Sequence, residues 1–366
     1  MERTKSYNSQ ILLIMSILIS IGLVMVYSSS AIMSNFKYGS STLFILKQFI
    51  GVVLGTILFI IFSNFDYNKL RKYMIPLLIF TIVLLVMVLV FGKSVAGAKR
   101  WLKIGPLNFQ PSELAKITVI LYLAWYIDRR KSKIKNFKEG ILKPFIVVGV
   151  ILLLIFLESD LGVPFLIFVT TIIILFIGGA RFLHISCTFI AVIPVIIYAI
   201  IKEPYRLKRF ITFLNPWADP KGSGYQLIQS LMAMGSGGFW GVGLGKSTIK
   251  MLFLPEAHTD FIFPIIGEEF GLLGTSIVLL LFLSLFYYGT KIAINAKNLF
   301  GSITAFGITL TIVLQSVINM SVSVGLIPTK GLSLPFISFG GSSILIAMAS
   351  MGILINIGKQ LKERNE

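Results

Sequence analysis

The chain has 366 residues, of which 56% are hydrophobic and 13% are charged. Because a soluble domain carries roughly 25% charged residues, this composition excludes an ordinary soluble protein and indicates an integral membrane protein. A single cysteine, Cys187, and two histidines, His184 and His258, exclude a disulfide framework and a multi-histidine zinc site. The first apolar run is too long for a signal peptide and no small-residue cleavage site follows it, so we expect no cleaved leader.

The net charge of +18 is large for a membrane protein. Cytoplasmic loops collect lysine and arginine, which accounts for part of this charge. The remainder indicates contacts with anionic lipids or with a phosphorylated lipid substrate. Nucleic-acid binding is not expected, because no soluble basic domain is present to carry it.

Apolar runs of about 20 residues cross a bilayer. Such runs predict an all-α polytopic membrane protein that forms a single integral membrane domain over residues 1–366. About ten transmembrane helices are expected, at 11–31, 44–62, 73–91, 112–127, 142–157, 161–179, 183–201, 261–289, 301–323 and 341–358. No internal repeat is visible, which argues against an inverted-repeat transporter.

The long segment 202–260 is predicted to form a large external loop between the seventh and eighth helices. Lysine and arginine are in excess on the side of both termini once this loop is discounted, so both termini are expected in the cytoplasm. Within the loop, Leu227, Leu231 and Met234 recur with the period of an amphipathic helix lying along the interface. The glycine-rich run at 235–245 offers bare backbone that a bulky ligand can approach closely.

The stretch Met251–Gly274 places a histidine and three acids at the start of, or inside, an apolar segment. Ionisable groups at membrane depth are costly, so they usually bind or react. Asp260 follows Thr259, a good helix N-cap, and Pro264 cannot donate an i→i−4 hydrogen bond to the carbonyl of Asp260. We therefore expect open, polar backbone at Asp260 and regard it as the best candidate base. Its alternative role is a helix-start charge favoured by the dipole.

Glu268 and Glu269 follow Asp260 by about two helical turns, and adjacent residues lie about 100° apart around a helix, so they cannot both face one site. This argues against two carboxylates sharing acid and base work. Glu268 is expected to satisfy polar groups between helices, including the region of Lys116.

Glu113 and Lys116 are spaced i,i+3 on the fourth predicted helix and can pair on one face. They form either a structural ion pair or part of a polar cavity that faces Asp260.

Asp160 lies in the tight external turn between the fifth and sixth helices, where it either caps the sixth helix or contacts a substrate or cation.

Four external bases between Lys93 and Lys103 run against the positive-inside rule. They are expected to bind an external anion, or alternatively to contact lipid headgroups.

The last loop, 319–343, is too apolar for a solvated loop and contains prolines and glycines that prevent a continuous helix. Irregular backbone of this kind is tolerated where it lines a cavity, and Lys330 can supply an outward-facing cation there.

Together these stretches resemble the SEDS family of bacterial cell-wall proteins (shape, elongation, division and sporulation), from the first predicted helix to the last. The resemblance rests on Arg100-Trp101, Gln110–Lys116, Asp160-Leu161-Gly162, Gly224-Tyr225-Gln226, Leu254–Phe263, Pro328–Gly331 and Leu334–Ser338. The forms at Asn215–Pro220, Gly224–Gln226 and Pro328–Gly331 are more similar to the division and sporulation branch. One departure stands out, because the family's usual Glu-Pro-Asp turn is here Glu158-Ser159-Asp160.

The resemblance implies a peptidoglycan glycosyltransferase of the bacterial cytoplasmic membrane that polymerises lipid II into a glycan strand on the outer face. It also implies a class B penicillin-binding protein as partner, within the division or elongation machinery. Asp260 matches the catalytic aspartate, and Glu113 and Lys116 match a functionally important intramembrane pair. We expect Asp260 to be the general base of an inverting transfer with undecaprenyl pyrophosphate as leaving group, whose charge nearby cations would stabilise. The candidate substrate-binding residues are Lys99, Arg100, Lys103, Glu113, Lys116, Asp160, Arg206, Arg209, Lys250, His258, Lys330 and Ser338.

No cofactor is certain from the sequence. A divalent cation, Mg²⁺ or Mn²⁺, could share the work of the basic residues, although no oxygen-rich cage is visible. Two other functions remain open. A lipid II flippase would use the same cavity and cations without a general base, and a non-catalytic scaffold would serve a penicillin-binding protein.

Overall fold

The computed structural model describes residues 2–95, 98–104, 107–202, 204–250, 254–328 and 331–361. It contains a helix at each of the ten predicted positions and two further helices in the 202–260 insert. The helices are α1 (Glu2–Tyr38), α2 (Leu43–Asn64), α3 (Met74–Phe91), α4 (Pro111–Arg130), α5 (Lys143–Leu157), α6 (Gly162–Ile177), α7 (Phe182–Ile201), α8 (Pro204–Leu214), α9 (Tyr225–Gly237), α10 (Ile262–Asn295), α11 (Leu299–Ser323) and α12 (Gly341–Lys359). Short helical turns occur at Tyr67–Arg71, Lys131–Lys133, Lys138–Leu142 and Pro216–Ala218.

Seven helices in the described part of the chain are long and apolar enough to cross a membrane, namely α1, α2, α3, α5 with its preceding turn, α10, α11 and α12. Helix α4 has sufficient length but carries Glu113 and Lys116 in its interior. Helix α6 is 16 residues long, and the apolar part of α7 is Phe182–Pro194. The arrangement is that of a multi-pass helical membrane protein.

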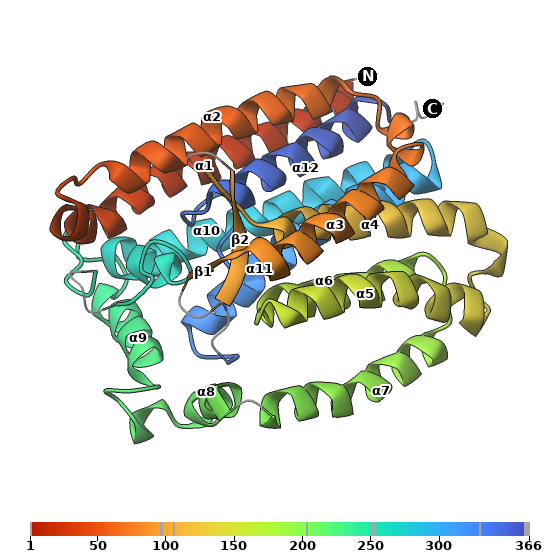
Figure 1. Ribbon diagram of the computed structural model, residues 1–366. Helices are drawn as coiled ribbons and strands as arrows, with labels where there is room; N and C mark the ends of the chain where they lie inside the picture. The colour runs from red at the N-terminus through yellow and green to blue at the C-terminus, as the bar shows by residue number, and fades with distance from the viewer. Residues whose placement is uncertain are drawn as a thin grey trace.

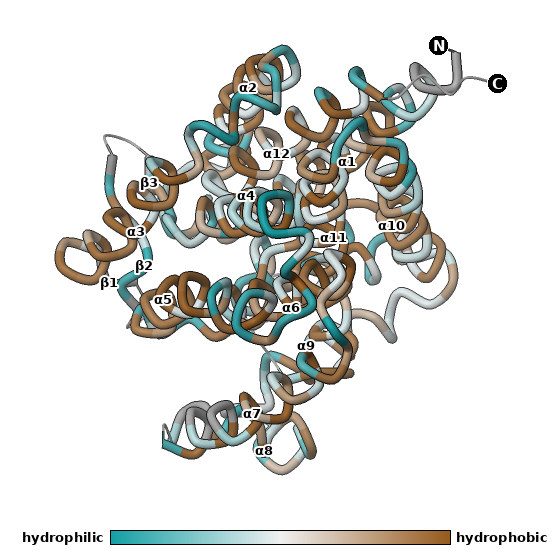
Figure 2. The backbone as a smooth tube through the Cα atoms, turned by 90° about the vertical axis from the view of Figure 1, so that its right-hand side faces the viewer, coloured by the Kyte–Doolittle hydropathy of each residue, from teal (hydrophilic) through white to brown (hydrophobic). Residues whose placement is uncertain are grey.

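The centre of the bundle is formed by α11 and α12, whose apolar windows are 78% and 72% buried, against 17% for α2 at the periphery. Figure 2 shows mainly hydrophobic residues along peripheral helices such as α3 and α5, as expected of helices that contact lipid. Both termini lie at one end of the bundle, whereas α9 lies at the opposite end (Figure 1).

The all-α prediction was wrong between α3 and α4, where three antiparallel strands occur in the order β1-β2-β3. They are β1 (Lys93–Val95), β2 (Ala98–Ile104) and β3 (Leu107–Phe109). Leu102 is buried between half-buried Trp101 and exposed Lys103, which is the alternation of a strand, but the run is short and strongly basic. The small sheet positions Arg100 beside the end of the bundle that contains Asp260.

Helix α10 is broken at Gly271, whose φ of 63° and ψ of −159° are not helical. The glycine-rich segment 238–243, which follows α9, fills the break. The amides of Val242 and Gly243 donate to the carbonyls of Glu268 and Glu269 at 2.9 and 3.0 Å. The amides of Leu272 and Leu273 donate to the carbonyls of Gly238 and Phe239 at 2.9 and 3.3 Å. These backbone groups are therefore satisfied within the protein.

We expect Gly271→Ala to destabilise the protein by about 2–5 kcal/mol, because a β-carbon there needs a strained backbone conformation in a crowded site. That β-carbon would lie 2.5 Å from both the amide nitrogen of Gly241 and the carbonyl oxygen of Phe239. Gly149→Ala in α5 is the matched control, because a β-carbon there would meet nothing within 4 Å. Thermal unfolding in detergent measures both variants, and equal midpoints would contradict the role of the break.

Candidate functional site

Asp260 lies in the turn that precedes α10, at the end of the bundle opposite the termini. Helix α10 begins at Ile262 with Phe261 as N-cap, so the prediction that Thr259 caps this helix was wrong. The side-chain hydroxyl of Thr259 instead donates to the carboxylate of Glu256 at 2.8 Å. Glu256 has a left-handed φ of 57°, and its carbonyl accepts the amide of Phe261, which closes the turn.

The backbone carbonyl of Asp260 has no helical partner, as expected from the proline at position 264. With no amide hydrogen at Pro264, the carbonyl of Asp260 receives the side-chain amide of Asn319 instead, at 2.8 Å. The same Asn319 nitrogen donates to the carbonyl of Leu332 at 2.6 Å. Asn319, which sequence reasoning missed, thus ties the start of α10 to the last loop.

Gly331 leaves bare backbone beside the Asp260 carboxylate. A β-carbon at Gly331 would lie 3.1 Å from Asp260 Oδ2 and 3.9 Å from Arg100 Nη1. The carboxylate of Asp260 and the guanidinium of Arg100 therefore both lie next to Gly331, which has no side chain to separate them.

Burial raises the pKa of Asp260 to about 7, with further contributions from the negative charges of Glu256 and Asp160. Arg100 and Arg209 oppose this shift by favouring the carboxylate. A carboxyl group that titrates near neutral pH is suited to accept a proton from a hydroxyl group.

Arg100 is held by the turn between α5 and α6. Its Nη2 donates to the carbonyl of Ser159 at 2.6 Å, and its Nη1 lies 3.7 Å from Oδ2 of Asp160. Asp160 Oδ1 accepts the amides of Gly162 and Val163 at 2.9 and 3.3 Å. Asp160 therefore caps the start of α6 and pairs with Arg100 at the same time.

The same turn buries Glu158, which sequence reasoning did not propose as a functional residue. Glu158 is 1% exposed, and its carboxyl oxygens have no hydrogen-bond partner among the described residues. Burial, together with the nearby charge of Asp160, raises the pKa of Glu158 to about 8, so this side chain is mainly protonated at neutral pH.

The other basic candidates separate into several environments. Lys99 and Lys103 are exposed and alternate with Arg100 along β2, so they lie on the opposite face of the strand. Arg209 in α8 is half-buried and contributes to the charge around Asp260. Arg206 also lies in α8, but its side chain falls outside the described part of the structure, and Lys330 falls outside it entirely.

Lys250 is engaged in a buried network and does not join the cations around Asp260. Its ammonium group lies 2.6 Å from Glu269 and donates to Ser28 in α1 at 2.9 Å. Glu268 binds Ser247 and the amide of Thr248, so the expectation that it satisfies the region of Lys116 was wrong. The two acids nevertheless have different partners, as their positions around α10 predicted.

His258 and Ser338 support the turn that precedes Asp260. The His258 ring lies against Phe44 and Phe339, with centroid distances of 4.6 and 5.8 Å, and burial lowers its pKa. The Ser338 hydroxyl donates to the carbonyl of Thr259 at 2.6 Å and accepts the amide of Leu334 at 2.8 Å. The hydrogen and one lone pair of the Ser338 hydroxyl therefore hold two loops together.

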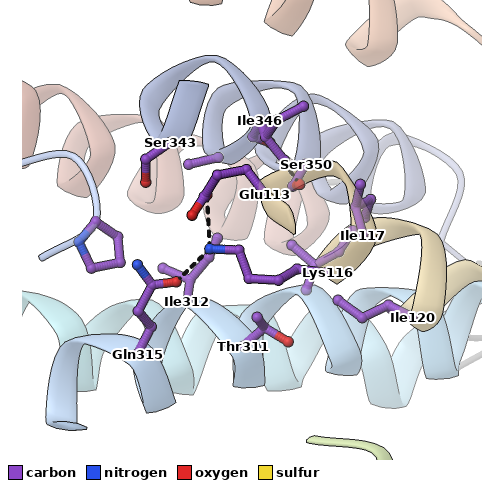
Figure 3. Close-up of a pocket in the computed structure, with 13 residues that line it drawn as sticks. Glu113, Lys116, Ile117, Ile120, Thr311, Ile312, Gln315, Ser343, Ile346 and Ser350 are labelled. Atoms are coloured by element: carbon purple, nitrogen blue, oxygen red, sulfur yellow. Dashed lines mark hydrogen bonds and ion pairs between the residues drawn. The ribbon is translucent and has the colours of Figure 1, made fainter. Parts of the chain in front are cut away.

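Glu113 and Lys116 form a buried ion pair inside the bundle at 2.8 Å. The Lys116 ammonium also donates to the side-chain oxygen of Gln315 at 2.7 Å, as Figure 3 shows. These residues line a cavity of about 30 Å³ together with Thr311, Ser343 and Ser350, among others. A cavity of this size holds about one water molecule. Asp260 is not among its lining residues.

Helix α11 connects this pair to the turn that contains Asp260. Gln315 donates to the carbonyl of Ser333 at 2.8 Å, and Asn319 contacts Asp260 and Leu332 from one helical turn further on. Sequence reasoning missed both amides. The available signal was a pair of amides spaced i,i+4 in an apolar helix, where unpartnered polar groups are costly.

No group of three or more histidine, cysteine, aspartate or glutamate side chains in the described part of the chain is arranged to hold a metal ion. The oxygens of Asp160 are engaged by backbone amides and Arg100. We therefore derive no chemical step through a metal.

Comparison with known proteins agrees with this architecture. The family described as "Cell cycle protein", which groups FtsW, RodA and SpoVE, matches residues 8–363. A probable peptidoglycan glycosyltransferase FtsW from Geobacter sp. (strain M18) is 37% identical over 364 residues, covering 99% of each chain. Stage V sporulation protein E of Bacillus subtilis is 38% identical, covering 97% of this chain and 98% of its own length.

Two solved structures share the fold. One is a chain from a peptidoglycan synthase complex that coordinates polymerization and crosslinking, with a TM-score of 0.80, 26% identity and coverage of 95% of this chain and 96% of that one. The other is the rod-shape-determining protein RodA of Thermus thermophilus, with a TM-score of 0.70, 23% identity and coverage of 96% and 97%.

The fold is that of a polytopic helical membrane protein. The chain belongs to the FtsW/RodA/SpoVE family.

Proposed function

We propose that this protein is a peptidoglycan glycosyltransferase that polymerises lipid II on the outer face of the bacterial cytoplasmic membrane. The observation that carries the proposal is the placement of Asp260, with its pKa raised to about 7, beside Arg100 and the bare backbone of Gly331. The relatives' names as peptidoglycan glycosyltransferases support the same activity.

In the proposed step, Asp260 accepts the proton of the acceptor's sugar 4-hydroxyl group. The resulting oxygen nucleophile forms a bond to the anomeric carbon of the donor and inverts its configuration. The bond between that carbon and the pyrophosphate oxygen breaks, and undecaprenyl pyrophosphate leaves with the bonding electron pair. Arg100 and Arg209, which already act electrostatically on Asp260, stabilise the charge that develops on the leaving group.

The proposed orientation places both termini in the cytoplasm and the Asp260 end outside. It rests on the charge distribution of the sequence and on the position of both termini at one end of the bundle (Figure 1). In this orientation α4, α6 and α7 cross the membrane along with the seven helices that are long and apolar enough to span it, which gives ten spans and places the 202–260 insert outside. The central position of α4 allows its charged pair to be covered by neighbouring helices.

The partner proposed for this chain is a class B penicillin-binding protein, which would crosslink the nascent strand within the division or elongation machinery. The solved peptidoglycan synthase complex that combines polymerization with crosslinking supports this proposal.

Purified protein, with its partner and fluorescent lipid II in vesicles, tests the activity. The expected product is a ladder of glycan strands that a muramidase degrades. Transbilayer movement of lipid II without polymer would favour the flippase alternative. Polymer made only by the partner, in amounts unchanged when this chain is inactivated, would favour the scaffold alternative.

The turn that holds Arg100 supplies a further prediction. Ser159 has a left-handed φ of 62°, which proline cannot adopt because its ring fixes φ near −65°. We expect Ser159→Pro to displace the carbonyl that binds Arg100. A hydrogen bond to a charged group contributes about 1.5–3 kcal/mol, so its loss should lower the rate of polymerisation about tenfold or more. Ser159→Gly, which accepts a positive φ, should retain activity.

Initial rates of glycan synthesis, normalised to folded protein, measure both variants. If Ser159→Pro retained the same activity as an active Ser159→Gly, the turn would not position Arg100. The usual proline of the family at this position is thus incompatible with the backbone of this chain.

A further inference from the structure

The glycine-rich segment beside the α10 break presents an exposed apolar surface. Between Lys221 and Lys246 the chain carries no charged residue. Phe239 and Trp240 are 55% and 76% exposed, and Val242 and Leu244 are also exposed. The rings of Phe239 and Trp240 lie edge to face, 5.0 Å apart. We name this surface, formed by Phe239, Trp240, Val242 and Leu244, the aromatic loop.

The depth of the aromatic loop follows from the helix that holds it. Its backbone is bonded to α10 on both sides of Gly271, at Glu268 and Glu269 and at Leu272 and Leu273. The part of α10 beyond Gly271, Leu272–Asn295, is about 36 Å long at 1.5 Å per residue. Because the hydrocarbon core is about 30 Å thick, this part alone crosses it, and Gly271 lies near one boundary.

The surface of the aromatic loop is continuous with the lipid-facing side of α10. Leu272, Leu273 and Ile277, which follow the break, are exposed apolar residues on a helix that is long and apolar enough to span the membrane. Tryptophan and other aromatic residues are enriched where the hydrocarbon core meets the headgroups. The glycine-rich backbone exposes no unpaired carbonyl of Gly238 or Phe239 to lipid, because both accept amides of α10.

We propose that the aromatic loop inserts into the outer leaflet and binds the acyl chains of bilayer lipids at the headgroup boundary. It is thus a membrane anchor within the 202–260 insert. Because the anchor is bonded to α10 close below Asp260, it fixes the height of the site relative to the headgroups. This inference concerns lipid contact and holds whether or not Asp260 is the base.

The intrinsic fluorescence of Trp240 tests the anchor. Trp101, Trp125 and Trp217 are replaced by phenylalanine in the full chain, which is then reconstituted into phosphatidylcholine–phosphatidylglycerol vesicles. We expect Trp240 to lose most of its fluorescence when the acyl chains carry bromine near the headgroup, and less when the bromine lies near the chain end. Aqueous iodide should quench it little.

A chain that retains only Trp217 is the matched control, because this residue is 63% exposed and lies in the same insert between charged residues. Trp240 quenched by iodide as strongly as Trp217, with no quenching by brominated lipid, would overturn the proposal. Protection of Trp240 from both quenchers would also overturn it, because a protein surface would then cover the loop.

A second measurement avoids the tryptophan replacements. In a Cys187→Ser chain, Trp240→Cys should react with a water-soluble maleimide far more slowly in vesicles than Lys221→Cys. Detergent that strips the lipid should remove the difference. Equal rates in vesicles would contradict insertion.

Discussion

Asp260→Asn should reduce glycan polymerisation by about 10²–10⁴-fold, the range expected for the loss of a general base. Asparagine preserves the size of the side chain but cannot accept the proton of the attacking hydroxyl group. The carbonyl of Asp260, which binds Asn319, is unaffected by the exchange, so the turn should keep its structure. Initial rates with fluorescent lipid II give the measurement.

Asp66→Asn is the matched control for this exchange. Asp66 caps a short helical turn by accepting the amide of Asn68 at 3.0 Å, and asparagine can cap in the same way. This variant should polymerise at the wild-type rate. Wild-type activity in Asp260→Asn would rule out the proposed mechanism, whereas loss of activity in both variants would point to a general effect of the preparation.

The rate of the wild-type protein should rise with pH through the region near 7. The pKa of Asp260 is raised to about 7, so the carboxyl group is protonated and inactive as a base below this value. Each unit of pH below it should lower the rate by about tenfold, and the rate should level off above it. A rate independent of pH between about 5.5 and 7 would contradict a base with a raised pKa.

The second large effect concerns the ion pair of Glu113 and Lys116. Lys116→Met should destabilise the protein by about 3–5 kcal/mol, because Glu113 is then left as an unpaired charge among apolar helices. The double variant Glu113→Gln with Lys116→Met should recover most of this loss. Thermal unfolding in detergent measures both variants, and an unchanged midpoint for the single variant would refute the prediction.

Lys143→Met is the comparison for that experiment. Lys143 pairs with Glu139, but its side chain is 43% exposed, and exposed pairs contribute about 0–1 kcal/mol. The activity of the stable double variant then separates two roles of the buried pair. Retained polymerisation indicates a structural role, and lost polymerisation with retained stability indicates a role in the reaction.

Most of the fold could be predicted because lipid imposes a simple pattern on sequence. Every apolar run of sufficient length became a helix, since only internal hydrogen bonding satisfies the backbone in a membrane. The strands β1–β3 were missed because a short basic run gives little periodic signal. The break at Gly271 was missed because it depends on a segment distant in sequence, the glycine-rich run after α9, that supplies the missing hydrogen bonds.

The site could be predicted in part. Asp260 was identified from its position and from Pro264, and its neighbour Arg100 from a local excess of basic charge. Residues such as Lys250 and Ser338 looked equally available in the sequence, yet Glu269 and the Thr259 carbonyl engage them. Sequence spacing indicates which groups share a local element, but only tertiary structure shows which polar groups are already satisfied.

The joint between the two parts of α10 has a consequence for mutational tolerance. It is formed by four backbone hydrogen bonds, whose strength does not depend on which side chains flank them. Side-chain exchanges at the joint therefore leave these four hydrogen bonds in place, whereas Gly241 and Gly271, where backbone meets backbone, should reject every side chain. At the two glycines the permitted variation is thus decided by the backbone alone, and at the neighbouring positions it is decided by what each side chain itself contacts.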